Sequence, residues 1–383
     1  MEFRDLKKQY QVLKNEIDNA MISVATGGIF IGGMIISDLE KSLAEYVGVR
    51  HCITCANGTD ALTMMMMALG VKSGDAVFVP DFTFFATAEI VAFQGATPIF
   101  VDVEKDTFNM DCKALEKEII SIKKEGKLHL KAIIPVDLFG LPANYHDIML
   151  VAKKYNLFVL EDGAQGFGGE IDGQKACSFG DAAITSFFPA KPLGCYGDGG
   201  AIFTNDDNIA NYVRSIQVHG KGTSKYDNIR IGMNSRLDTI QAAILQVKYN
   251  AFKNYELVNV NLVAKQYSEK LAGIIQPPYV PKGFMSSWAQ YTLLFENTQQ
   301  RDNIQNSLKR QGIPTMVYYP IPLHNQKAFE MLPYKNNCTV SEMLCQRVLS
   351  FPIDPYKDEK SIDIVIQALK IGLSLPLIKQ GIQ

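Results

Sequence analysis

The sequence predicts an α/β fold: a large domain whose mostly parallel seven-stranded sheet is flanked by helices, followed by a smaller C-terminal α+β domain. Between residues 52 and 217, short apolar runs alternate with segments of helical periodicity. Strands that alternate with helices form parallel sheets covered on both faces. After residue 277 the order of elements becomes mixed, and a length of 383 residues suits two domains.

The first half of the chain supplies the predicted sheet. Residues 5–24 have apolar side chains at helical spacing, and residues 37–47 predict a helix with Ser37 as N-cap and Glu40 at the capping-box position. The expected strands are 52–56, 76–80, 97–103, 131–139, 157–162, 182–188 and 200–204. The expected helices between them are 59–69, 86–94, 111–124, 144–155 and 206–217.

The second half begins with a long helical stretch, residues 236–271, that can link two domains. We therefore expect a large domain over residues 1–250 and a small one over 251–383. The small domain is predicted to contain strands 287–296 and 315–320, a helix over 301–312 ended by Gly312, and helices near 340–348 and 359–371.

Composition excludes several classes of protein. Lys and Arg number 38 and Asp and Glu 40, so the net charge of −2 argues against nucleic acid or an anionic membrane as the main partner. Seven cysteines, an odd number, indicate reduced thiols in a cytoplasmic protein. The uncharged stretch 19–37 is interrupted by four glycines, which favours a Gly-bent loop beside a pocket over a membrane span, and the start lacks a signal-peptide core.

Two motifs follow strands early in the sheet. In CANGTDAL (55–62) a strand ends and a helix begins, so its backbone N–H groups, with Gly58 and Thr59, could hold a phosphate; a plain N-capped turn is the alternative. In PDFTFFATAEIV (80–91), Phe82 and Phe84 stand two residues apart. One of them could stack on a flat ring, or both could belong to the core.

Two further motifs carry ionisable groups. In LFVLEDGAQGFGG (157–169), Asp162 ends an apolar strand, where it could bind a metal, a ribose or a protonated ring nitrogen, or cap a helix. In SFFPAKPLGCYGDGGAIFT (186–204), Lys191 lies between Pro189 and Pro192. A desolvated lysine has a lowered pKa and can form a Schiff base, whereas a surface lysine stays solvated.

The order of these groups favours one cofactor. A phosphate-binding turn, an aromatic ring, an Asp at a strand end, and a Ser and a Lys five residues apart are the groups that hold pyridoxal 5'-phosphate. No metal is expected: the C-x-x-C of Cys52 and Cys55 lacks further ligands at zinc spacing, and Met64 to Met67 suit core packing.

The chain resembles the DegT/StrS sugar-nucleotide aminotransferases, which are fold-type I enzymes that use pyridoxal phosphate. The resemblance covers essentially the whole chain and rests on ANGTDAL, FTFFAT, EDGAQ, SFFPAKPLGCYGDGGA and GMNSRLDTIQAA, in that order. Within the family the chain is most similar to enzymes that aminate a 3-keto sugar, the UDP-2-acetamido-2-deoxy-3-oxo-glucuronate aminotransferases.

The resemblance implies roles for particular residues. Lys191 corresponds to the lysine that forms the Schiff base and moves protons, and Asp162 to the partner of the pyridine nitrogen. The other implied cofactor contacts are Gln165 near the ring hydroxyl, Phe84 on the ring face, Gly58, Thr59 and Ser186 at the phosphate, and Asn234 at the phosphate of the neighbouring subunit. Arg236, Tyr319 and His324 are implied at the substrate, although Arg236 could equally fix the start of a helix.

The resemblance also implies a reaction and its partners. A cytoplasmic homodimer with shared active sites would move an amino group from L-glutamate to a nucleotide-linked keto sugar, for lipopolysaccharide or O-antigen synthesis. The alternative sugars are a dTDP-3-keto-6-deoxyhexose or a UDP- or GDP-linked 4-keto-6-deoxy sugar. A related sugar dehydratase would carry His in place of Lys191, and a non-catalytic regulator need not keep that lysine.

Overall fold

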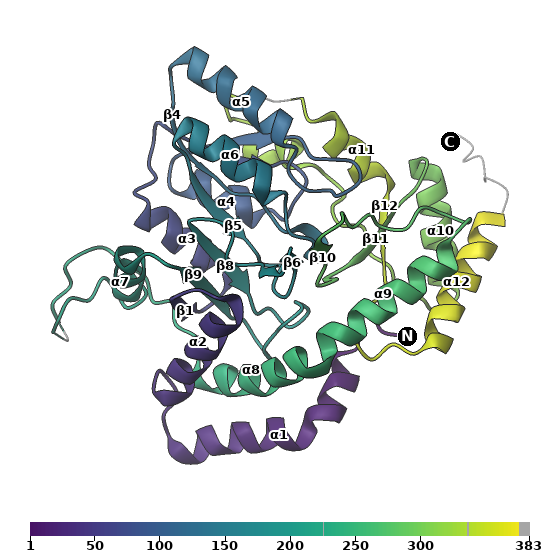
Figure 1. Cartoon of the computed structure of the whole chain (residues 1–383), viewed down its shortest axis with the longest axis horizontal. Coiled ribbons are helices and arrows are strands. Elements are labelled where there is room, and N and C mark those ends of the chain that lie inside the picture. The colour runs from purple at the N-terminus through teal and green to yellow at the C-terminus, as the bar shows by residue number, and fades with distance from the viewer. Residues whose placement is uncertain (225, 335–336, 375–383) are drawn as a thin grey trace.

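The computed structural model describes residues 1–224, 226–334 and 337–374 and contains a central seven-stranded sheet (Figure 1). The strand order is β1-β9-β8-β5-β4-β2-β3. Their bounds are β1 His51–Cys55, β2 Asp75–Pro80, β3 Thr97–Val101, β4 His129–Ile133, β5 Phe158–Asp162, β8 Ala182–Ser186 and β9 Gly200–Thr204. Only β9 among these runs antiparallel to its neighbours, so the prediction of a mostly parallel seven-stranded sheet is confirmed.

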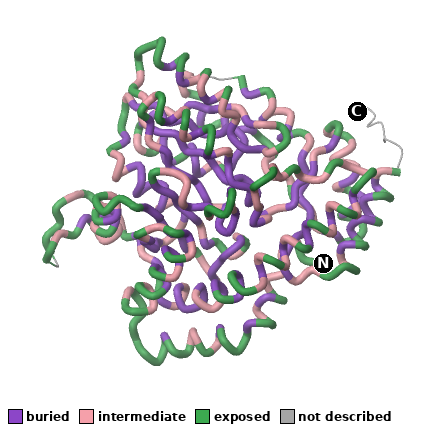
Figure 2. Tube along the Cα trace, viewed as in Figure 1, coloured by how far each residue is buried: buried purple, intermediate pink, exposed green. Residues whose placement is uncertain are grey.

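Helices cover both faces of the sheet because successive residues of each strand are apolar. In β2, Val77 and Val79 pack in the cluster that includes α3 and α4, whereas Ala76 and Phe78 pack in the cluster of α5 and α6. The sheet lies in the buried centre of the molecule (Figure 2). The covering helices are α1 Leu6–Gly27, α2 Met34–Val47, α3 Gly58–Ala68, α4 Ala86–Phe93, α5 Cys112–Glu125, α6 Tyr145–Tyr155, α7 Asp207–Ile216 and α8 Thr239–Ala251.

The predicted cap of the second helix is wrong. Helix α2 begins at Met34 after Gly33, whose φ of 82° requires a glycine. Ser37 lies inside the first turn, where its hydroxyl donates to the carbonyl of Met34. Glu40 instead accepts hydrogen bonds from the backbone and hydroxyl of Thr54. Of the stretch 19–37, only residues 28–33 form a Gly-bent loop, because residues 19–27 belong to α1 and residues 34–37 to α2. None of the helices described has both the length and the apolar character that a bilayer span needs.

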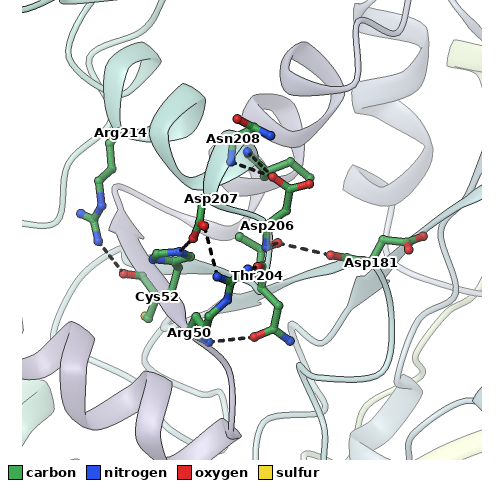
Figure 3. Close-up of polar contacts among 11 residues, drawn as sticks. Arg50, Cys52, Asp181, Thr204, Asp206, Asp207, Asn208 and Arg214 are labelled. Carbon is green, nitrogen blue, oxygen red and sulfur yellow. Dashed lines mark hydrogen bonds and ion pairs between the residues drawn. The ribbon is translucent and has the colours of Figure 1, made fainter.

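A capped helix start fixes the edge of the sheet near β1 (Figure 3). The carboxylate of Asp206 accepts from the backbone N–H groups of Asn208 and Ile209 and so caps α7. Asp207 pairs with Arg50, which precedes β1, with 3.1 Å between Nη1 and Oδ2. Helix α7 is thereby held beside the strand that leads into the first predicted motif.

The C-terminal part packs around a separate apolar cluster drawn from three helices, α9, α10 and α12, and two strands, β11 and β12. Helix α8 continues through a π-helical turn, Phe252–Glu256, into α9 Leu257–Leu271. The remaining elements are β10 Phe284–Met285, β11 Tyr291–Leu294, α10 Thr298–Arg310, α11 Thr339–Arg347, β12 Val348–Phe351 and α12 Glu359–Ser374, and β10 joins β6 Glu170–Ile171 and β7 Gln174–Lys175. The domain boundary at residues 250 and 251 stays a prediction, because α8 and α9 are continuous there.

Residues 315–320 do not form the predicted strand. Only Met316 pairs, with Ser350, after which the chain turns so that Tyr319 contacts Gln165. Strand β11 pairs instead with β12, which begins at Val348, the last residue of the predicted helix 340–348. Of the predicted strand 287–296 only Tyr291–Leu294 forms β11, and β4 overlaps the predicted strand 131–139 only at residues 131–133.

Candidate active site

The predicted site residues gather where the parallel strands end. Because β1, β2, β5 and β8 run in the same direction, their carboxyl ends share one edge of the sheet. Gly58 and Thr59 follow β1, Phe84 follows β2, Asp162 and Gln165 follow β5, and Ser186 ends β8. Lys191 follows Ser186 in the loop that leads to β9.

Asp162 is a buried carboxylate with two hydrogen-bond donors. The side chain is 3% exposed, Thr87 Oγ1 donates to Oδ2 at 2.8 Å, and the backbone N–H of Ala164 donates to Oδ1 at 3.2 Å. Burial raises its pKa, while these two bonds and the charge of Lys191 lower it. Thr87 was not predicted, because its partner lies 75 residues away in the sequence.

Lys191 is only partly exposed and faces the charge of Asp162. Burial lowers the pKa of Lys191 to about 8, against the opposing attraction of Asp162. Its backbone N–H donates to the carbonyl of Phe188 at 2.9 Å, which makes the loop compact. The lysine therefore gains a neutral, nucleophilic fraction near neutral pH.

Two glycines keep the start of α3 close to β8 and β9. A Cβ atom on Gly58 would lie 2.9 Å from Cβ of Ser186, and one on Gly200 would lie 2.5 Å from the carbonyl carbon of Asn57. Asn57 caps the helix by accepting from the backbone N–H of Asp60 at 2.7 Å. The N–H groups at a helix start carry a partial positive charge and have no partners within the helix. Gly58, Thr59 and Ser186 therefore suit an anion such as a phosphate.

Gln165 and two aromatic residues, Tyr319 and Phe84, form a connected group near Asp162. Gln165 accepts a hydrogen bond from the backbone N–H of Phe139 at 2.9 Å and donates from Nε2 to the hydroxyl of Tyr319 at 3.0 Å. The ring of Phe84 is 56% exposed, and its centroid lies 6.4 Å from that of Tyr319. Burial raises the pKa of Tyr319, so its hydroxyl stays neutral. Phe84 can thus present one face to a flat ring.

Asn234 and Arg236 are hydrogen-bonded to each other. Nη2 of Arg236 donates to Oδ1 of Asn234 at 2.6 Å, and Asn234 is exposed. Ser235 between them is buried and accepts from the backbone N–H of Ala56. In the described part of the chain, no hydrogen bond or ion pair joins Asn234 or Arg236 to Lys191 or Asp162.

His324 is held by two carboxylates. Its Nδ1 lies 2.7 Å from Oδ2 of Asp81 and its Nε2 lies 3.2 Å from Oε1 of Glu342. The hydrogen bond with Asp81 and the nearby negative charges raise the pKa of His324. Cys338 also lies within 4.8 Å of this pair, but 2.7 Å is a hydrogen-bond distance between His324 and Asp81. The expected absence of a metal and the substrate role of His324 both stay predictions.

Comparison with known proteins identifies the chain. The sequence profile of the DegT/DnrJ/EryC1/StrS aminotransferase family matches residues 11–370. The UDP-2-acetamido-2-deoxy-3-oxo-D-glucuronate aminotransferase of Pseudomonas aeruginosa is 45% identical over 370 residues, which cover 96% of this chain and 99% of that protein.

Solved structures agree in fold and cofactor. A DegT DnrJ EryC1 StrS aminotransferase from Brucella abortus superposes with a TM-score of 0.95 at 46% identity, over 98% of this chain and 100% of that one. NtdA from Bacillus subtilis, solved with bound cofactor PMP, has a TM-score of 0.84 at 29% identity, over 95% and 82% of the two chains. The chain therefore belongs to the DegT/DnrJ/EryC1/StrS aminotransferase family and is a fold-type I aminotransferase that uses pyridoxal phosphate.

Proposed function

We propose that this enzyme transfers the amino group of L-glutamate to C3 of UDP-2-acetamido-2-deoxy-3-oxo-glucuronate, in the cytoplasm, for a cell-surface polysaccharide. The observation that carries this proposal is the 45% identity, over nearly the full length of both chains, to an aminotransferase named for that sugar. A net charge of −2 suits a small anionic substrate held by a local site rather than an extended polyanion.

The residues at the sheet edge fit the cofactor. Its phosphate would accept hydrogen bonds from the start of α3, at Gly58 and Thr59, and from Ser186; the tight approach of Gly58 to Ser186 keeps that space narrow. Phe84 would cover one face of the ring. Asp162 would face the ring nitrogen and Gln165 the ring hydroxyl.

Each residue then has a chemical task. When bound, pyridoxal phosphate supplies a protonated ring that withdraws electrons from the carbon bearing the amino group. Asp162, whose carboxylate accepts from Thr87 and Ala164, would pair with the ring nitrogen and favour its protonated form. Lys191 carries a proton at Nζ between substrate and cofactor, and its pKa of about 8 suits both accepting and releasing it near neutral pH.

A homodimer would complete the site. The loop before α2 and the segment before Asn234 expose apolar side chains: Ile29, Phe30, Ile31, Met34, Ile229 and Ile231 are all more than 45% exposed. A cluster of this kind marks a protein interface. Asn234 would then bind the phosphate of the neighbouring subunit, and Arg236, Tyr319 and His324 would meet the substrate.

The proposed substrate is tested with the purified enzyme. It is incubated with L-glutamate and, separately, with UDP-linked 3-oxo-glucuronate, a dTDP-3-keto-6-deoxyhexose and a UDP- or GDP-linked 4-keto-6-deoxy sugar, and each product is identified by mass spectrometry and NMR. We expect the highest kcat/KM with the uronate. Preference for a neutral or 4-keto sugar would overturn the substrate but not the reaction.

Arg236 is predicted to recognise the C6 carboxylate of the uronate. A guanidinium binds a carboxylate through two parallel hydrogen bonds, and lysine cannot reproduce that geometry. Arg236→Lys should therefore lower kcat/KM more for the uronate than for its 6-hydroxy counterpart. The difference between the two losses should correspond to about 1.5–3 kcal/mol of activation free energy. Arg50→Lys is the matched control, because Arg50 forms an exposed ion pair with Asp207 far from the site. An equal loss on both sugars would assign Arg236 to structure alone.

A further inference from the structure

Two buried carboxyl groups lie beneath the turn that carries the predicted ring contacts. Asp137, in the loop after β4, and Glu161, in β5 next to Asp162, are both 0% exposed. Neither has a part in the chemistry described above. Buried acids of this kind are costly, so each needs partners that account for its charge or its proton.

Asp137 joins three segments. Its Oδ1 accepts from the backbone N–H of Ala143 at 3.0 Å and from the hydroxyl of Tyr145 at 2.9 Å, which ties the loop after β4 to the start of α6. Its backbone N–H donates to the carbonyl oxygen of Asp162 at 3.1 Å. The same residue therefore holds both its own loop and the end of β5.

The carboxyl group of Asp137 also packs directly on the turn from Asp162 to Gly166. A Cβ atom on Gly166 would lie 2.3 Å from Oδ2 of Asp137, and one on Gly163 would lie 3.7 Å from it. Glycine at position 166 is required because any side chain there would occupy the space of the carboxyl group. The turn and Asp137 thus fit each other closely.

The loop that Asp137 closes also orients Gln165. The backbone N–H of Phe139, two residues after Asp137, donates to Oε1 of Gln165. Phe139 has a φ of 58°, a left-handed conformation that a phenylalanine adopts only when its surroundings hold it. With Oε1 fixed in this way, Nε2 of Gln165 faces Tyr319.

The two carboxyl groups differ in their hydrogen bonds. Glu161 accepts from the backbone N–H groups of Cys177 and Phe179, which favour its ionised form, although burial raises its pKa to about 7. Oδ2 of Asp137 is buried, and no hydrogen-bond donor reaches it from the residues that the structure describes. The side chains of Asp137 and Glu161 interact, so a proton on Oδ2 would give that atom a partner in Glu161.

The groups around Asp137 favour the neutral acid. Burial and the charge of Glu161 raise the pKa of Asp137 well above its usual range. Tyr145 on α6 and Cys177 also face the pair, and burial raises the pKa of each, so both stay neutral. Asp162, at the end of β5, adds negative charge near Cys177.

We propose that Asp137 is a positioning residue that, as a neutral acid sharing its proton with Glu161, shapes the turn that presents Asp162 and Gln165 to the cofactor. This inference rests on the roles given to Asp162 and Gln165 under the proposed function. It is independent of which sugar the enzyme aminates.

The first test measures the proton in the apoprotein. The unfolded chain releases the Asp137 proton near pH 4, whereas the folded chain keeps it, so the folding equilibrium constant should fall up to tenfold per pH unit as the pH rises above 4, up to the raised pKa. Asp137→Asn keeps the shape but has no proton to release. Its unfolding free energy, measured in urea between pH 5 and 7, should therefore lose less with rising pH than that of the wild type, by the equivalent of one proton. Asp75→Asn is the control, because Asp75 is also a buried carboxylate, at the amino end of β2. Equal slopes in wild type and Asp137→Asn would overturn the shared proton.

The second test measures positioning in the holoenzyme without any sugar. An asparagine can accept from Ala143 and Tyr145 and donate to Glu161, so Asp137→Asn should bind pyridoxal phosphate within about threefold of wild type, with the same visible circular dichroism. Asp137→Ala and Asp137→Ser should weaken binding at least tenfold and alter that signal. Wild-type binding and spectra in the Ala or Ser variant, or a loss in the Asn variant equal to theirs, would overturn the positioning role. Failure of the sugar proposal would leave both readouts unchanged.

Discussion

At the residue scale, the site combines an ionised acid and a weakly basic lysine in one buried space. Burial raises the pKa of Asp162, and two donors and the charge of Lys191 limit that rise and so favour the ionised form. Lys191 loses part of its basicity because burial outweighs the attraction of Asp162. The same burial that makes the lysine useful as a proton carrier therefore destabilises the apoprotein when the lysine is charged.

Lys191→Met is predicted to abolish turnover and to stabilise the apoprotein at neutral pH. The pKa of Lys191 is about 8 in the folded protein and 10.5 in the unfolded chain. The wild type therefore has its full stability above pH 10.5 and loses part of it as the pH falls through 8, because the buried lysine must then take up a charge. The gain at pH 7 is at most ~3 kcal/mol, and less because the side chain is partly exposed. Unfolding free energies at pH 7 and 10.5 check this, and the difference should fade at the higher pH.

Lys248→Met is the matched control for Lys191. Lys248 is 1% exposed, burial lowers its pKa to about 8 as well, and it lies over the ring of Tyr196 rather than facing Asp162. This variant should show the same pH-dependent gain in stability and keep its turnover. Turnover in Lys191→Met comparable to that of Lys248→Met would refute the role of Lys191.

At the element scale, the residues that follow β2 and β3 bind two segments of the C-terminal part of the chain. Asp81, after β2, accepts from the backbone and ring of His324, and Asp102, after β3, accepts from the backbone N–H groups of Val340 and Ser341 at the start of α11. Asp81 is three residues before Phe84. The contacts of His324 with Asp81 therefore also restrain the segment that carries Phe84, the residue predicted to stack on the ring.

The pair of His324 and Asp81 predicts a pH dependence. The folded pKa of His324 is raised, so its contribution to stability is full below the ordinary value of 6.5 and is lost as the pH rises through the folded pKa. His324→Gln should cost about 1.5–3 kcal/mol at pH 6 and less at pH 9. Urea unfolding at both pH values checks this. His146→Gln, which removes an exposed pair with Asp172, is the control variant. A His324→Gln cost that does not fall with pH would contradict the prediction.

Elements were predictable where the local sequence decides them. The strand-helix alternation and the chemical groups at strand ends follow from short runs of residues, and Asp162, Ser186 and Lys191 stand where their motifs put them. Contacts between distant segments were not predictable: Ser37 loses its capping role to Gly33, and residues 315–320 lose their strand because Tyr319 turns to Gln165. Thr87, Asp81 and Asp137 were missed for the same reason.

At the scale of the whole molecule, Asn234 is exposed, and its predicted partner is the phosphate of a neighbouring subunit. The segment before Asn234 extends away from the body of the chain beside α7 and carries exposed apolar residues such as Ile231, which is 84% exposed (Figure 1). Burying such side chains against a second subunit is favourable by about 25 cal/mol per Å² of apolar surface. A dimer would therefore bury the exposed apolar side chains and, at the same time, bring Asn234 to the site of the neighbouring subunit.

Mixed dimers provide the last prediction. Lys191→Ala and Asn234→Ala homodimers should each be nearly inactive, the first without its proton carrier and the second with weakened phosphate binding. If Asn234 serves the neighbouring subunit, a mixed dimer of the two variants contains one site with both residues intact and one with neither. Random reassociation makes half of the dimers mixed, so activity should recover to about a quarter of wild type, an expectation that rests on closed two-fold assembly. Activity no higher than that of the Asn234→Ala homodimer after subunit exchange, verified by mass spectrometry of differently tagged chains, would show instead that Asn234 acts within its own subunit.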